Sequence, residues 1–369
     1  MAALSNITFN YTEYCAVANV VASRIELKVL FTLESIFGLI ALFPNTMTLV
    51  LLWRIKVFHA NLRLILANLT CSLWAISASM SVKAIVRLTQ DPCSFVMPVK
   101  SCFWRDFFIV IPLHNALISL VILNLERLYA TARYRSYDYA SSVPFLGMFL
   151  IACAWAITLG LNVPGYFSVM KDRWVPVCEL AIAASQQGVA RVIITMVTFE
   201  GVAAVITVFV YVYNRYILGR MAINRARYDL SARFQVGQNE QLNTALMPGM
   251  ILHMICHLPT YIFLTLIFVR GGQLTLDTKT WLLHLTYLWR LTYAMIDPIL
   301  LLSLNASLRQ GLQKTAVGKV LFLAIDHYRK RNQAKTQDVR AKSINVMNAH
   351  FDYLQQSWAV QKAPTNNDK

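Results

Sequence analysis

Seven segments of the chain combine a near-continuous apolar composition with the length needed to cross the hydrocarbon core of a bilayer. None of them shows the period-two alternation that is typical of a half-buried β-strand. A helix satisfies its own backbone hydrogen bonds in lipid, so the pattern predicts an all-α membrane protein, a seven-transmembrane helix bundle. The expected spans are 29–53, 64–82, 107–125, a segment within 143–170, about 192–214, a segment within 242–269, and 281–304.

The composition also favours a membrane protein. Hydrophobic residues make up 57% of the 369 residues and charged residues only 14%, unlike a soluble domain of this length. The net charge of +16 would suggest a nucleic-acid partner in a soluble protein. Here, roughly two-thirds of the 34 Lys and Arg residues lie in the tail and after spans one, three and five. This bias places those segments in the cytoplasm and the amino end outside, so the expected partner is lipid and not nucleic acid.

The topology divides the chain into three parts. Residues 1–28 are expected to form an extracellular and otherwise unstructured amino-terminal segment, 29–304 the seven-transmembrane domain, and 305–369 a cytoplasmic tail. The amino segment lacks the pattern of a cleavable signal peptide and carries glycosylation sequons at Asn6 and Asn10. The start of the tail is basic and partly apolar, which predicts a helix at the inner membrane surface.

The seven cysteines separate by this topology. Three fall inside spans, where they are expected to pack as small apolar residues. The other four lie on the extracellular side, where disulfides persist. Four cysteines allow three pairings, of which we favour Cys102 with Cys178, leaving Cys15 with Cys93.

The end of the third span carries the most informative motif. The span itself, 107–125, has no formal charge, and it stops at Glu126 and Arg127. A cysteine before this span and an acid–arginine pair after it are typical of the central helix of rhodopsin-like receptors. The simpler alternative is a membrane helix that ends in mixed charge, with Arg127 extending toward lipid phosphates.

Ionisable residues inside the spans suggest a ligand site. Five of them lie at a similar depth, roughly 9–16 Å from the outer ends of spans one, three, five, six and seven. Charges facing lipid are costly, so we expect these groups to face inward and to form one polar layer. An alternative is that Glu34 and Arg290, on neighbouring first and last helices, simply neutralise each other. The expected ligand-binding residues are Glu34, His114, Asn115, Glu200, His257 and Arg290.

Two other classes of protein compete with a receptor. A transporter could use the intramembrane charges, although the sequence shows no half-chain repeat or paired broken helices. A metal-dependent membrane hydrolase could use His253 and His257, which are one helical turn apart. The glutamate of an HExxH motif is missing between them, so we expect neither catalysis nor a metal or other cofactor.

The loops add a family resemblance. The motifs at 54–61 (RIKVFHAN), 126–131 (ERLYAT), 134–138 (YRSYD), 211–216 (YVYNRY) and 228–235 (YDLSARFQ) occur in order. Together they resemble nematode serpentine chemoreceptors of the Sra superfamily, most of all class epsilon. The resemblance implies a sensory receptor for a small molecule, coupled to a heterotrimeric G protein, in the membrane of sensory-neuron cilia. The implied coupling residues are Glu126, Arg127, Tyr129 and Arg233.

The predicted topology can be tested by glycosylation mapping in a parent that lacks its own sequons through Asn6→Gln and Asn10→Gln. A sequon introduced after span four should acquire a glycan, because that segment is expected outside. A sequon introduced in 305–369 should stay unmodified. Electrophoretic mobility before and after enzymatic deglycosylation measures both, and the reverse pattern would contradict the orientation.

Overall fold

The structure is a computed structural model of the chain. It divides into two compact units, Met1–Arg309 and Gln310–Lys369. Nearly all of the residues that the structure describes belong to the first unit. These are residues 10–55, 58–133, 144–167, 174–179, 182, 186–223, 230–270, 273–315 and 318.

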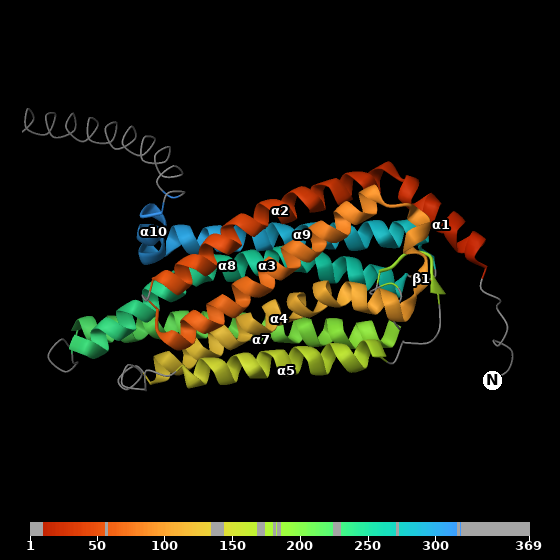
Figure 1. Cartoon of the computed structure of the whole chain (residues 1–369). Helices are drawn as coiled ribbons and strands as arrows, with labels where there is room; N and C mark the ends of the chain where they lie inside the picture. The colour runs from red at the N-terminus through yellow and green to blue at the C-terminus, as the bar shows by residue number, and fades with distance from the viewer. Residues whose placement is uncertain are drawn as a thin grey trace, which may run out of the picture. The chain divides into compact units, whose positions relative to one another are not determined.

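The first unit is a bundle of long helices that run side by side (Figure 1). Helix α2 packs along α3 and α9, α4 contacts α3, α5 and α7, and α8 lies between α7 and α9. The seven helices of the bundle are α2 (Ile25–Arg54), α3 (Ala60–Thr89), α4 (Val99–Ala132), α5 (Phe145–Phe167), α7 (Gln186–Ile223), α8 (Leu230–Val269) and α9 (Leu276–Leu304).

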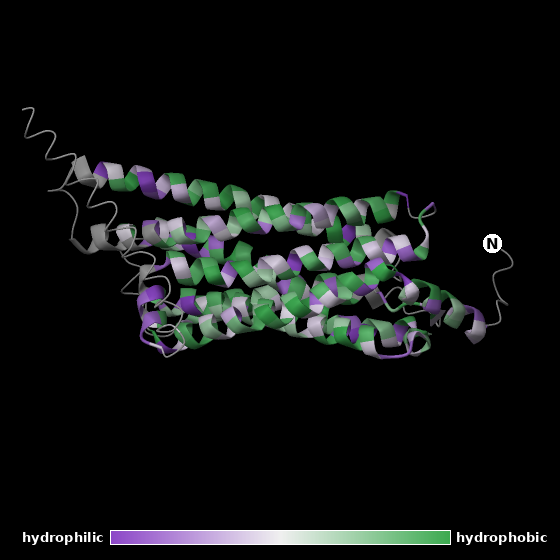
Figure 2. Ribbon diagram, turned by 90° about the horizontal axis from the view of Figure 1, so that it is seen from above, coloured by the Kyte–Doolittle hydropathy of each residue, from purple (hydrophilic) through white to green (hydrophobic). Residues whose placement is uncertain are grey.

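Six of these helices are long and apolar enough to cross a membrane: α2, α3, α4, α5, α7 and α8. Helix α9 has 29 residues, which is also a spanning length, but Arg290 and Asp297 lower its mean hydropathy. Its position between α2 and α8 makes it the seventh helix of the bundle. Figure 2 shows hydrophobic residues along the middle of the helices and hydrophilic residues gathered toward their ends.

Polar side chains connect the helices inside the bundle, whereas large apolar side chains such as Phe43 and Phe209 are exposed on its surface. Asn45 of α2 donates a hydrogen bond to the carbonyl of Ala294 in α9 at 2.9 Å. Asn68 of α3 donates to Ser119 of α4 at 2.8 Å and accepts one from Trp155 at 3.1 Å. Such bonds contribute roughly 0.6–2 kcal/mol each in a membrane bundle.

Both disulfides lie at one end of the bundle, which we call the outer end because the sequence predicts it to face outside. The pairs are Cys15–Cys93 and Cys102–Cys178, as favoured from the sequence. The second bridge follows a short antiparallel pair of strands, β1 (Met97–Pro98) with β2 (Trp174–Val175). Bridge and strands together hold the loop before Glu179 against the start of α4.

The amino-terminal segment is more ordered than expected. Residues Tyr11–Ser23 form the helix α1, whose first turn is capped by Asn10: its side chain accepts a hydrogen bond from the amide of Glu13 at 3.4 Å. The Tyr11 hydroxyl donates to the carbonyl of Cys93 in η1 (Pro92–Phe95) at 3.2 Å. The expectation of an unstructured segment is therefore wrong for these residues. Asn6 lies outside the described residues.

A short helix, α10 (Ala306–Gln313), begins directly after the bundle. Asn305 caps it, accepting a hydrogen bond from the amide of Leu308 at 3.0 Å. The rest of the tail is outside the described residues apart from 314–315 and 318. The inner-surface location of this helix stays a prediction.

Two glycines give a matched test of helix packing. A Cβ at Gly38 in α2 would overlap the hydroxyl of Ser81 and come within 2.9 Å of the Ser77 carbonyl in α3, whereas a Cβ at Gly201 would meet no atom within 4 Å. Gly38→Ala should therefore destabilise the bundle by about 1–3 kcal/mol. Gly201→Ala should be neutral or stabilising, because alanine favours the helix. Thermal unfolding of the purified variants measures this, and equal effects would contradict close α2–α3 packing at Gly38.

Candidate functional site

The ionisable residues expected in one polar layer are divided between two places. Glu34 belongs to an ion network at the outer end, whereas His114, Glu200, His257 and Arg290 lie in or next to a histidine-rich region. The structure therefore brings four of the five groups together and places Glu34 in a different cluster, because equal depth does not place side chains on the same side of the bundle.

The histidine-rich region joins α4, α5, α7 and α8. His253 and His257, one turn apart on α8, stack with ring centroids 3.9 Å apart. The Nδ1 atom of His253 lies 3.0 Å from the carboxylate of Glu200 on α7. The Nδ1 atom of His114 lies 2.6 Å from the amide oxygen of Asn162 on α5. Each of these three side chains is thus fixed by a neighbouring aromatic ring or a hydrogen bond.

A cavity of about 30 Å³ lies beside these rings, and we call it the histidine cavity. Its polar wall is formed by His114, His257, Tyr261 and Arg290, and its remaining lining is aliphatic side chains and Met196. This space fits a water molecule or two and is well below the roughly 300 Å³ of a typical ligand pocket. A small molecule could enter only if the surrounding helices moved apart.

Asn115, the neighbour of His114, does not line this cavity. Its side-chain amide is buried and donates to the hydroxyl of Ser72 on α3 at 2.8 Å. Ser119, one turn later, receives the bond from Asn68 on the same side of α4. Asn115 is thus placed between α3 and α4, where it links two helices.

Six charged or ionisable side chains form what we call the outer ion network. The ammonium group of Lys83 on α3 lies 2.8 Å from Asp106 on α4 and 2.8 Å from Glu179 in the loop after β2. Arg87 on α3 donates to the carboxylate of Glu179 at 3.1 Å. All of these side chains are at least nine-tenths buried. The network consists of Glu34, Lys83, Arg87, Asp106, Glu179 and His284.

His284 on α9 lies between two carboxylates. Its Nδ1 atom is 2.9 Å from Glu34 and its Nε2 atom is 3.1 Å from Glu179. An imidazole can donate from both nitrogens only when it is protonated. The network then holds three carboxylates and three cations, so that its formal charges cancel. The alternative in which Glu34 pairs with Arg290 is corrected accordingly. The Glu34 carboxylate is engaged by His284, which lies about 9 Å from Arg290 along α9.

Glu179 is completely buried, yet its surroundings favour the charged form. Burial alone would raise the pKa of this carboxyl, but Lys83, His284 and Arg87 together hold the pKa well below its ordinary range. A depressed folded-state pKa means that the stabilisation is present at neutral pH and is lost only under strongly acidic conditions. Glu179 is therefore ionised throughout the physiological pH range.

Most of the outer ion network was not identified from the sequence. Of its six members, only Glu34 is among the site residues expected from the sequence. A usable signal was present in Glu179, which directly follows the bridged Cys178 and is therefore held close to the top of α4. Lys83 and Arg87, one turn apart on α3, could have indicated an acidic partner.

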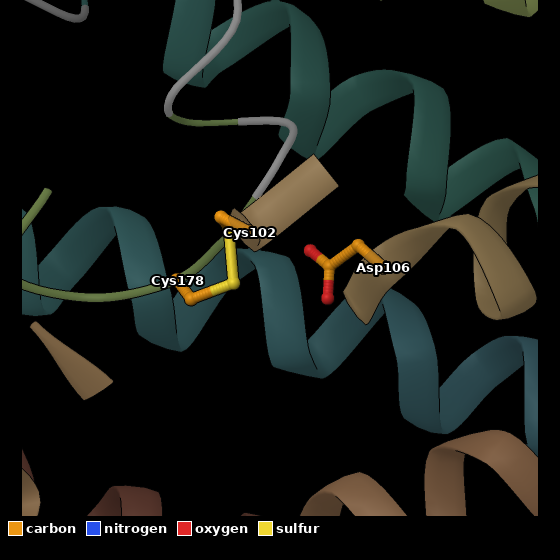
Figure 3. A group of neighbouring side chains, drawn as sticks. All are labelled: Cys102, Asp106 and Cys178. Atoms are coloured by element: carbon orange, nitrogen blue, oxygen red, sulfur yellow. A yellow bond between two sulfur atoms is a disulfide. The ribbon is translucent and has the colours of Figure 1, made fainter. Parts of the chain in front are cut away.

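The disulfide next to this network is not a metal site, although its atoms are close together. Ligand atoms of Cys102, Cys178 and Asp106 lie within 4.8 Å of one another. Figure 3 shows the two sulfur atoms bonded to each other, with the Asp106 carboxylate turned toward them. Sulfur atoms in a disulfide are not thiolates, the form in which cysteine binds metals. Asp106 is instead engaged by Lys83.

The opposite, inner end of α4 carries the acid–arginine pair. The guanidinium of Arg127 donates two hydrogen bonds to Glu126, at 2.5 and 2.6 Å, and a third to Asn239 of α8 at 3.2 Å. Both members of the pair are buried, whereas Tyr129 is exposed. Arg233 lies in the first turns of α8, and its side chain is outside the described part of the structure. Arg127 thus joins α4 to α8 through Asn239.

Comparison with known proteins agrees with this architecture. The family described as "Serpentine type 7TM GPCR receptor class ab chemoreceptor" matches residues 12–337. Serpentine receptor class alpha/beta-14 of Caenorhabditis elegans is 24% identical over 204 residues, which cover 53% of this chain and 51% of that protein. The match therefore spans about half the length of this relative. Both matches are to class ab, so the expected class epsilon is unconfirmed.

The revised pairing of Glu34 predicts a specific pattern of double mutants. Glu34→Gln should destabilise the protein by roughly 3–5 kcal/mol, because it leaves His284 with one carboxylate fewer. Adding His284→Gln should recover part of that loss, since it removes the stranded cation. Adding Arg290→Gln should not recover any of the loss. Its own effect on stability should simply add to that of Glu34→Gln. Thermal unfolding measures these three variants, and a recovery produced by Arg290→Gln and not by His284→Gln would favour the pairing of Glu34 with Arg290.

Proposed function

This chain belongs to the class ab serpentine chemoreceptors, a receptor class and not an enzyme family, and we propose that it binds a small molecule in the outer half of the bundle and activates a heterotrimeric G protein at its inner face. The observation that carries the proposal is the Arg127 guanidinium, which is buried at the inner end and bonded to both Glu126 and Asn239. A cation that merely extended toward lipid phosphates would not be buried between two helices.

The proposed ligand site is the histidine cavity. Arg290 offers a guanidinium and Tyr261 a hydroxyl, and two imidazoles complete the polar wall. The remaining lining is aliphatic apart from Met196. A guanidinium binds carboxylates and other anionic groups through paired hydrogen bonds. We therefore propose a ligand with an anionic or strongly accepting head and a small apolar body.

Helix α8 provides the link between the two proposed sites. It carries His257 in the histidine cavity and Asn239 beside Arg127, roughly 27 Å apart along the helix. Because the cavity is too small for a ligand, binding has to displace a neighbouring helix. A displacement of α8 would break the hydrogen bond between Asn239 and Arg127 and free the guanidinium for the G protein.

The test is nucleotide exchange on an added G protein, measured with purified receptor in lipid nanodiscs during a screen of small acidic compounds. With an active compound, Arg290→Gln should reduce the apparent affinity roughly 10- to 100-fold, because it removes a charge-assisted hydrogen bond. Arg127→Ala should keep ligand binding but lose exchange. Arg127→Lys should not restore exchange, since an ammonium cannot reproduce the planar fork.

Arg191→Gln is the matched control, because Arg191 is an exposed arginine of α7 outside the cavity lining. It should leave both affinity and exchange unchanged. Full nucleotide exchange with Arg127→Lys would favour the alternative in which Arg127 is a simple interfacial cation. Uptake of an active compound into vesicles without any nucleotide exchange would favour a transporter instead.

A further inference from the structure

The second outer loop places one carboxylate into a cationic pocket. Glu179 follows the bridged Cys178 and reaches between α3 and α9. One of its oxygens lies 3.1 Å from both Arg87 and His284, and the other lies 2.8 Å from Lys83. The whole side chain is excluded from solvent. Glu179 is therefore bound by three cations as a carboxylate ligand would be.

Each of these cations is also held by a partner other than the Glu179 side chain. Lys83 is bonded to Asp106 at 2.8 Å. Arg87 lies over the ring of Phe95, 4.3 Å from its centroid, and His284 is bonded to Glu34. The positions of the three cations are thus supported by side chains that would remain if Glu179 were removed.

We propose that Lys83, Arg87 and His284 form a carboxylate-binding site that Glu179 fills as a tethered ligand, and that a small external carboxylate takes its place when Glu179 is withdrawn. This site lies apart from the histidine cavity: His284 and Arg290 are about 9 Å apart along α9. The inference does not rest on the proposed function, because binding to this site is measured without any signal.

The donor geometry selects carboxylates over other small ligands. Three donors converge on two oxygens of one planar group, an arrangement that a carboxylate satisfies completely. A primary amide has a single oxygen and would turn its amino group toward a cation. A halide can accept from the same donors but cannot occupy both oxygen positions. The small closed space further limits the ligand to short acids such as formate and acetate.

The tether explains why the site is filled in the native chain. The disulfide and the β1–β2 pair keep Glu179 next to its cations, which gives it an effective concentration in the millimolar range or above. A free carboxylate must therefore compete with a permanently present one. An external carboxylate should therefore bind weakly to the wild-type protein. It should bind more strongly after the Glu179 side chain is removed.

The first experiment removes the tethered ligand. Glu179→Ala leaves the three cations with one carboxylate fewer, so the melting temperature in nanodiscs should fall by roughly 5–10 °C. Sodium formate or sodium acetate should restore most of that loss in a saturable manner. Sodium chloride at equal ionic strength and acetamide at equal concentration should not. Glu26→Ala, at an exposed acid of α2, is the control and should show neither the loss nor the recovery.

A second variant separates the site from general salt effects. Glu179→Gln removes the charge but still fills the space, so it should be less stable than the wild type and should not be stabilised by acetate. The proposal is overturned if Glu179→Ala is as stable as the wild type, if acetate fails to stabilise it, or if chloride or acetamide stabilises it equally.

If Glu179→Ala does not fold, the wild-type protein provides the measurement. Competition by acetate should increase deuterium uptake in residues 174–179, because Glu179 then spends part of its time out of the site. Acetamide and chloride should have no such effect. Unchanged uptake over the full range of acetate concentrations that the protein tolerates would overturn the proposal.

Discussion

The cost of burying a charge governs this structure. An unpaired ion inside a membrane bundle costs several kcal/mol, so each buried charge restricts where its partners can lie. The outer ion network joins four helices, α2, α3, α4 and α9, with the loop that carries Glu179. Moving any one of these elements would leave a buried charge without its counter-ion. The outer end therefore behaves as one rigid assembly.

At the inner end, the acid–arginine pair connects fewer of the described elements than the outer ion network does. Glu126 and Arg127 are neighbours on one helix, so their ion pair connects no separate elements. The connection to α8 described here is a hydrogen bond from Arg127 to the uncharged Asn239, and breaking it leaves the ion pair intact. A hydrogen bond of this kind contributes about 1–3 kcal/mol. Under the proposed function, a ligand of modest affinity would supply more free energy than this one hydrogen bond contributes.

The sequence predicted the fold better than the site. Apolar spans depend on composition alone, so the helical bundle was predicted correctly. Topology left three pairings of the four outer cysteines open, and the favoured pairing is the one observed. The partner of Glu34 was not predicted, because pairing depends on how each helix is rotated about its axis. Uniformly apolar spans such as α2 carry little information about that rotation. Glu179 lies in a loop, where no helical periodicity indicates direction, and its role became visible only through its distances to Lys83 and His284.

The two polar regions share helix α9, and this restricts how a ligand can act. His284 fixes the outer part of α9 to the ion network, and Asn45 fixes its middle by a hydrogen bond to the Ala294 carbonyl. Arg290 lies between these two attachments, so its backbone has little freedom to move. Under the proposed function, a ligand that enlarges the histidine cavity would displace one of its other walls, which are formed by α4, α7 and α8. Helix α8 also carries Asn239, which accepts a hydrogen bond from Arg127, so in this proposal a displacement of α8 at the cavity would change the contact at the inner face.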